Sequence, residues 1–278
     1  MVLSQDENRA LFTARLGLLL GFSLLIAFNT LLIIYTVMLI FTRGDPEAYK
    51  SIFYPIQGTI LVLDIIACGL LAMGFWAFGK YHDTIRNQAQ NMALGFAIWT
   101  VVTLSWRLPL LWTPAEGINP ISKRFISGEF GMFMPHFEFL RVNYPGFLIS
   151  SMFMFILMML MVRLIKNYRV YENFQTVNLN LFQVYGLVYM VGAMLMGLGW
   201  LAFGPSMSGT TLGDLLLVIY VFAWLTLFLV LPILGLWVFY PAFTIHRSAV
   251  ETLKFILKRK SERDRAMEHS HEGESAHS

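Results

Sequence analysis

Charged residues are scarce in this sequence. Only 13% of the 278 residues are Asp, Glu, Lys or Arg, whereas 57% are hydrophobic. Roughly a quarter of the residues of a soluble domain are charged, so this composition excludes a soluble globular protein. It indicates an integral membrane protein. The sequence also lacks a phosphate-binding glycine loop and a soluble catalytic domain, so any enzyme activity would have to be built within the membrane helices.

Cysteine is almost absent, and no histidine lies inside an apolar run. The single cysteine, Cys68, excludes an internal disulfide and any multi-cysteine iron–sulfur or zinc site. His82, His136 and His246 fall in loops or at helix ends, which excludes haem held by two histidines inside the bilayer. We therefore expect no cofactor held by ligands of this chain and leave open a bound lipid or quinone.

Long apolar runs dominate what is present. A helix needs about 20 apolar residues to cross a bilayer, and six such runs occur, at 16–41, 52–78, 92–112, 146–165, 181–204 and 212–241. The first is too long for the apolar part of a signal peptide and is flanked by Asp6 and Glu7, so we expect it to remain as a helix. The predicted fold class is all-α, a polytopic bundle of six transmembrane helices.

The Lys and Arg residues predict the orientation. Fourteen of the 20 fall on one set of flanks and five on the other, and Arg107 lies within a span. Because Lys and Arg are enriched in cytoplasmic loops, both termini are expected in the cytoplasm. An even number of spans agrees with this orientation. The net charge of +3 indicates attraction to anionic headgroups, and nothing supports a nucleic-acid role.

Five segments follow from the same pattern. A cytoplasmic N-terminal segment (1–15) precedes the six-helix transmembrane domain (16–241), which contains an outer loop (114–145) rich in phenylalanine. The loop is expected to lie along the interface, with a lid or a docking surface as the alternatives. A basic amphipathic helix (242–265) should lie on the inner membrane surface, and the tail (266–278) should be disordered.

Two opposite charges inside the spans give the strongest hint of a site. Asp64 lies near the middle of the second span, and Arg107 lies close to the outer end of the third. Each is costly alone in hydrocarbon. In antiparallel neighbours the two side chains lean toward each other across a gap of roughly 7 Å. We therefore predict a buried Asp64–Arg107 pair, which is either a structural lock or part of a polar cavity; the alternative is an arginine that extends to the headgroups.

Two further residues complete the predicted pocket for a substrate or a quinone. Asn29 lies near the middle of the first span, and Trp106 precedes Arg107. Pro109 removes the hydrogen bond to the carbonyl of Ser105, which adds a polar partner near the arginine. A lone asparagine is more often a helix–helix hydrogen bond, and that alternative stays open.

Metal signals are weak. The outer loop contains ligand types at a spacing that matches no firm motif, at Glu129, His136 and Glu138. Two methionine pairs lie one helical turn apart, as in copper-uptake channels, at Met154 with Met158 and at Met190 with Met194. Methionine is also an apolar filler, so packing is the favoured interpretation and no metal site is predicted.

Two functions remain. The favoured hypothesis is a non-catalytic membrane subunit of a larger complex, respiratory or otherwise redox-active and thus part of electron transport, whose helices dock to partner membrane subunits or line a quinone or lipid pocket. The alternative is a small transporter or channel with a midplane site at Asp64, Arg107 and Asn29. We expect no catalytic centre in the chain itself.

Overall fold

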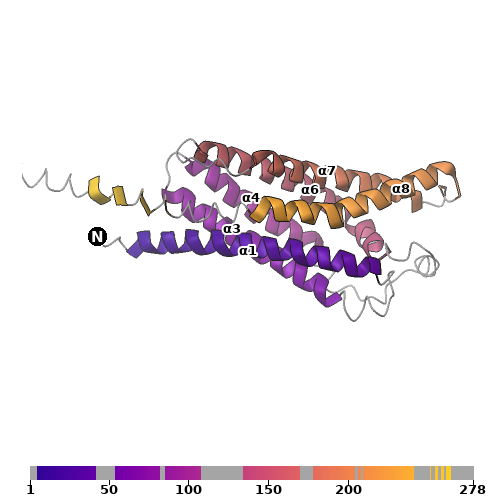
Figure 1. The fold of residues 1–278 in the computed structure, drawn as a ribbon, viewed down its shortest axis with the longest axis horizontal. Helices are drawn as coiled ribbons and strands as arrows, with labels where there is room; N and C mark the ends of the chain where they lie inside the picture. Colours follow the sequence, from indigo (N-terminus) through magenta and orange to yellow (C-terminus); the bar gives the residue numbers. More distant parts are fainter. Residues whose placement is uncertain are drawn as a thin grey trace, which may run out of the picture.

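The computed structural model of the chain is a bundle of long helices lying side by side (Figure 1). It describes residues 5–41, 54–81, 85–107, 134–169, 178–203, 206–207, 209–240, 251, 254–255, 258–259 and 261–263. No strand occurs among these residues. The all-α class predicted from composition is therefore confirmed.

Six long helices make up the bundle. Their bounds are α1 Gln5–Phe41, α3 Tyr54–Tyr81, α4 Arg86–Arg107, α6 Met134–Arg169, α7 Leu179–Trp200 and α8 Thr211–Leu225. A 3₁₀ turn, Leu201–Phe203, ends α7. A π-helical segment, Thr226–Val230, follows α8, and α-helix resumes over 231–240.

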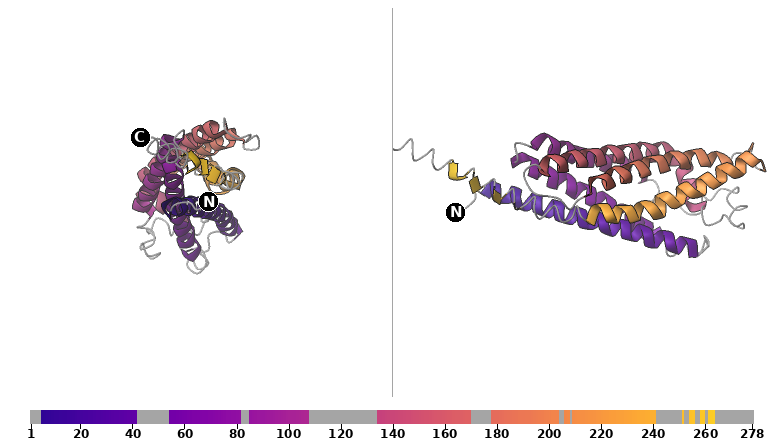
Figure 2. Two further views of the ribbon diagram at one scale, coloured as in Figure 1. Left: turned by 90° about the vertical axis from the view of Figure 1, so that its left-hand side faces the viewer. Right: turned by 45° about the horizontal axis from the view of Figure 1, so that its top comes forward.

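The helices form a closed ring. Each packs against the next in the order α1, α3, α4, α6, α7 and α8, and the π-helical segment after α8 packs back against α1. Figure 2 shows the ring end-on in its left view. Successive helices run in opposite directions, so the two ends of the described chain lie at the same end of the bundle (Figure 1).

Within the described part of the chain, five helices are long and apolar enough to cross a membrane. These spans are Asn8–Met38, Val62–Lys80, Tyr144–Asn167, Leu179–Gly199 and Thr211–Tyr240. The remaining helix, α4, occupies its place in the ring but is less apolar, and the end of its predicted span, 108–112, lies outside the described residues. An integral membrane protein is thus supported, whereas the sixth span and the side of the membrane on which each terminus lies stay predictions.

The C-terminal part is described at a few positions. Residues 251, 254–255, 258–259 and 261–263 are all helical. The guanidinium of Arg259 lies 4.7 Å from the centre of the Phe255 ring, one turn away. These positions agree with the predicted helix at 242–265, but its location on the membrane surface is not tested. The outer loop 114–145 lies outside the described residues up to 133, and the tail 266–278 lies outside them entirely.

The first residue of α8 is set by a side-chain cap. Thr210 is the N-cap, and its hydroxyl accepts a hydrogen bond of 3.0 Å from the amide of Gly213. Such a cap satisfies one of the amide groups that have no partner in the first helical turn. Asp214 lies in that first turn, where the positive end of the helix dipole favours a carboxylate. It is exposed, so it is a helix-end residue rather than part of the bundle interior.

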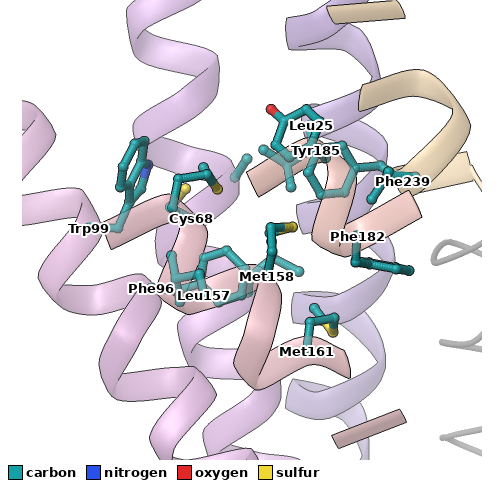
Figure 3. Close-up of a cluster of buried hydrophobic side chains, with 14 of the residues drawn as sticks. Leu25, Cys68, Phe96, Trp99, Leu157, Met158, Met161, Phe182, Tyr185 and Phe239 are labelled. Atoms are coloured by element: carbon teal, nitrogen blue, oxygen red, sulfur yellow. The ribbon is translucent and has the colours of Figure 1, made fainter. Parts of the chain in front are cut away.

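A close backbone approach joins α1 to α3. A methyl group at Gly17 would lie 2.6 Å from the carbonyl oxygen of Leu70 and 2.7 Å from the Cα of Gly74. Only glycine fits at such a distance, as at other small-residue contacts between membrane helices. Apolar side chains from all six helices fill the interior. Figure 3 shows part of this cluster, including Phe96, Leu157 and Phe182.

Candidate functional site

The described residues whose polar side chains are fully buried gather in one half of the bundle. We call the half that contains the start of α1 and the end of α3 the proximal half, and the half that contains the end of α1 and the start of α3 the distal half. Six buried polar or charged residues are described, and all lie in the distal half or at its border: Asn29, Thr36, Asp64, Thr103, Ser150 and Ser151. Because polar groups are costly in hydrocarbon, this grouping marks the candidate site.

Asn29 and Asp64 lie at one level on adjacent helices. Gly17 touches Gly74, which fixes the register of α1 against α3. Asn29 is twelve residues further along α1 and Asp64 is ten residues back along α3, which are rises of about 18 Å and 15 Å. The side chains are 1% and 3% exposed, respectively. Asp64 lies about 15 Å from the distal end of α3, at the third position of the apolar span Val62–Lys80.

The side chain of Asn29 joins two helices. Its Nδ2 donates a hydrogen bond of 2.7 Å to the carbonyl of Leu25 in the same helix. Its Oδ1 lies so close to Gly235, in the last helix, that a methyl group there would collide with it. Asn29 is therefore held at the contact between α1 and the helix over 231–240, as expected for an asparagine that packs two helices together.

Asp64 shares a face of α3 with the only cysteine. The Sγ of Cys68 donates a hydrogen bond of 3.7 Å to Oδ1 of Asp64, one turn away. Both residues are buried. The same face continues into the proximal half, where Phe75 stacks on Phe96 of α4 with ring centres 5.9 Å apart. Phe75 also packs edge-on against Phe22 of α1, with ring centres 6.4 Å apart, so the face of α3 that carries Asp64 is turned toward both α1 and α4.

Two polar side chains of α4 face this part of α3. A methyl group at Gly79 would lie 3.0 Å from Cβ of Ala89, which fixes the register of α3 against α4. Counting fifteen residues back to Asp64 and fourteen forward to Thr103 gives rises of about 22 Å and 21 Å, so these two lie at one level. By the same count Trp99 lies at the level of Cys68, and its ring packs edge-on against Tyr189 of α7, with ring centres 6.3 Å apart.

Helix α6 adds two serines at the same level. Gly95 of α4 packs against Leu157, since a methyl group at Gly95 would lie 2.5 Å from Cδ2 of that leucine. From this contact, Thr103 is eight residues forward and Ser150 is seven residues back, a difference of about 1.5 Å in rise. The hydroxyl of Ser151 donates a hydrogen bond of 2.7 Å to the carbonyl of Leu148. Four helices therefore bring buried polar side chains to one layer.

A proline explains a further polar contact in the distal half. Pro232 has no N–H, so the carbonyl of Phe228, four residues earlier, loses its usual helical donor. The hydroxyl of Thr36 in α1 donates to this carbonyl at 2.7 Å, and it also lies 2.8 Å from the carbonyl of Leu32. Next to this contact the helix contains a π turn, in which the amide of Leu231 bonds to the carbonyl of Thr226. The last helix is therefore interrupted next to Pro232, and Thr36 of α1 bonds to the carbonyl that the proline leaves free.

The predicted pocket is placed only in part. Asn29 and Asp64 are brought to one level, whereas the side chains of Trp106 and Arg107 lie outside the described residues. The helical backbone places Arg107 one turn beyond Thr103, about 6 Å closer to the distal end. The Asp64–Arg107 pair therefore stays a prediction.

The described residues give no support for a metal site. No group of three or more His, Cys, Asp or Glu side chains occurs among them. The side chains of Glu129, His136 and Glu138 lie outside the described part. Of the methionines, Met158 is buried against Gly186, whereas Met194 is 43% exposed. The two methionine pairs therefore do not line one shared interior.

Sequence reasoning missed five residues of the polar layer and its surroundings: Thr36, Trp99, Thr103, Ser150 and Ser151. A signal was present for the first three. Pro232 leaves the carbonyl of Phe228 without its helical donor, and Thr36 donates to that carbonyl. Trp99 and Thr103 are four residues apart, so they share one face of α4.

Comparison with models of protein families, with curated proteins and with solved structures finds no match for this chain. Its function is therefore argued from the bundle itself.

Proposed function

We propose that this chain is a small membrane transporter or channel for polar solutes, with Asp64 and Asn29 at its central site. The observation that carries the proposal is the common level of these two buried side chains on adjacent helices. A buried ionisable residue is rare in membrane helices and usually belongs to a pathway for a substrate or an ion.

The surroundings of Asp64 favour this function. Thr103 and Ser150 add buried hydroxyl groups at the same level, from α4 and α6. A helix interruption lies close to the site in the last helix, at the π segment Thr226–Val230. Transporters bind their substrates near the midplane, beside interrupted helices, and π segments inside α-helices often mark functional sites.

The chemistry at this level suggests a class of solute. A carboxylate accepts hydrogen bonds, whereas amide and hydroxyl groups both donate and accept. Small neutral molecules with N–H or O–H groups suit this set. Glycerol and urea are suitable first probes.

The test is solute flux through vesicles that contain the purified chain. Light scattering after an osmotic step with glycerol or urea should report faster entry than in vesicles without protein. Asp64→Asn should reduce the added flux by about tenfold, which corresponds to the loss of about 1.4 kcal/mol of interaction with the passing solute. The matched control is Asp214→Asn, because Asp214 is exposed at the end of α8. Flux equal to that of empty vesicles, or unchanged in Asp64→Asn, contradicts the proposal.

The other hypothesis from the sequence is a subunit of a respiratory or redox complex. It depends on the outer loop and on a quinone pocket beside Trp106 and Arg107, which lie largely outside the described residues. Mass analysis of the complex extracted in mild detergent discriminates between the two functions. Companion subunits that carry haem, iron–sulfur clusters or copper would favour this second function over transport.

A further inference from the structure

Most hydroxyl groups on the described helices donate a hydrogen bond within their own helix. The side chains of Thr13, Ser23, Thr30, Thr100 and Thr226 each donate to the carbonyl four residues earlier. This local bond is the usual solution for Ser and Thr in a membrane helix, where no water is at hand.

Thr103 departs from this pattern. Its side chain is 1% exposed, and its hydroxyl makes no hydrogen bond to any described residue. Thr100, three residues earlier on the same helix, makes the usual bond of 2.9 Å to Phe96. A buried hydroxyl group without a hydrogen-bond partner destabilises the folded state. We therefore expect a partner for the hydroxyl group of Thr103.

A second polar group on the same face has no described partner. The indole N–H of Trp99 is buried, the side chain being 2% exposed, and it makes no hydrogen bond within the described part of the chain. In Figure 3 the indole nitrogen lies on the edge of the ring that is nearer to Cys68. An indole N–H can only donate, so whatever satisfies it must supply an acceptor atom. The guanidinium of Arg107, which also only donates, cannot be that partner.

The neighbouring helix supplies acceptor atoms. Asp64 lies at the level of Thr103, and Cys68 at the level of Trp99, on the face of α3 that is turned toward α1 and α4. A carboxylate accepts several hydrogen bonds, so Asp64 can accept one more beside that of Cys68. A group between the two helices that accepts from α4 can donate its own proton to α3.

We propose that Trp99, Thr103 and Asp64 form a binding site for a hydroxyl group. The oxygen accepts from the indole N–H and exchanges a hydrogen bond with Thr103, and the hydroxyl proton is donated to Asp64. Water is the smallest occupant with this chemistry, and a polyol such as glycerol presents the same group. The proposal deepens the proposed transport function and rests on it only in placing this site on the solute route.

The first test compares two threonines of α4 in the detergent-purified chain. Thr103→Val removes the hydroxyl and keeps the shape of the side chain. If the hydroxyl is bonded to an occupant, this change should lower the thermal midpoint by about 3 °C. Thr100→Val, whose hydroxyl bonds only within its helix, should shift it less. A midpoint for Thr103→Val at or above that of the unmodified chain overturns the proposal, because removing an unsatisfied group from a dry interior is not destabilising.

The second test reads Trp99 directly and does not depend on a stability change. The indole signal is identified in the spectrum of ¹⁵N-labelled protein by its loss in Trp99→Phe. After transfer to D₂O, the indole proton should exchange faster than the backbone amide of Trp99, which is protected inside α4. Exchange no faster than that amide overturns the proposal.

A third measurement assigns the source of the hydroxyl. Titration with glycerol should shift the indole signal if a polyol occupies the site, whereas an unchanged signal with rapid exchange assigns the oxygen to water. The two proposals fail separately. If flux depends on Asp64 but the indole proton of Trp99 exchanges slowly, only the proposed hydroxyl site is wrong. If the indole proton exchanges rapidly but no such flux is seen, only the proposed transport function is wrong.

Discussion

The two halves of the bundle are held together differently. In the proximal half, α1 and α3 approach until Gly17 touches Gly74, and aromatic rings such as Phe75 and Phe96 fill the interior. The distal half has a close approach of its own, between Gly199 and the backbone of Tyr220, but it also has hydrogen bonds between helices, as from Thr36 to the carbonyl of Phe228. Close packing tolerates no added volume in either half. The two halves therefore differ in the polar contacts of the distal half, which suit it to binding.

The largest effect is expected where the backbones touch. Gly17→Leu places a side chain against Leu70 and Gly74, where even one methyl group lies 2.6 Å from a backbone atom. The cost should be about 3 kcal/mol or more, because the two helices must separate. Unfolding of the purified chain in detergent, followed by circular dichroism, measures it. Gly69→Leu is the control, since a Cβ at Gly69 meets nothing within 4 Å; equal losses from both changes would contradict the packing of the proximal half.

An intermediate effect is expected at the border of the two halves. Gly235→Ala pushes a methyl group against Oδ1 of Asn29 and should cost about 2 kcal/mol. The shorter side chain of Asn29→Ser should recover part of this loss in the double variant. Thermal midpoints of the two single variants and the double variant measure the coupling, and purely additive losses would show that the two residues do not meet.

A smaller effect is expected where Thr36 supports the last helix. Thr36→Val removes the donor to the carbonyl of Phe228 and should cost about 1 kcal/mol. Pro232→Ala restores an N–H four residues after Phe228, so Thr36→Val should cost less in that background. Unfolding free energies of the four proteins of this cycle measure the difference. The same cost in both backgrounds would disprove the role of Pro232.

The smallest effect is expected for one hydrogen bond between α6 and α7. The hydroxyl of Tyr144 donates to the carbonyl of Ala193 at 3.2 Å. Tyr144→Phe keeps the ring and should cost about 0.6 kcal/mol, the average for such bonds in membrane bundles. Tyr240→Phe is the control, because Tyr240 is 67% exposed. Indistinguishable midpoints for the two variants would assign no net stability to the Tyr144 bond.

Sequence alone predicted most of the fold and part of the site. The length and apolarity of the runs gave five of the spans, because the bilayer imposes both requirements on each helix separately. Asn29 and Asp64 stood out because polar groups in an apolar run are visible without any partner. Thr103 and Trp99 did not stand out, because both residue types are ordinary in a membrane helix when the side chain bonds locally or lies at an interface.

The sequence by itself determined that the chain is helical and apolar, where each helix lies along it and which residues carry polarity, since these properties belong to single segments. Only the tertiary structure decided that Asn29, Asp64, Thr103 and Ser150 reach one level, and that Thr36 meets the carbonyl left by Pro232. The height of a residue along the bundle depends on how adjacent helices are aligned lengthwise. This alignment is fixed by contacts such as Gly17 with Gly74 and Gly95 with Leu157. Those contacts arise between different helices, and the residue pattern within one helix does not specify which residues of another helix it will meet.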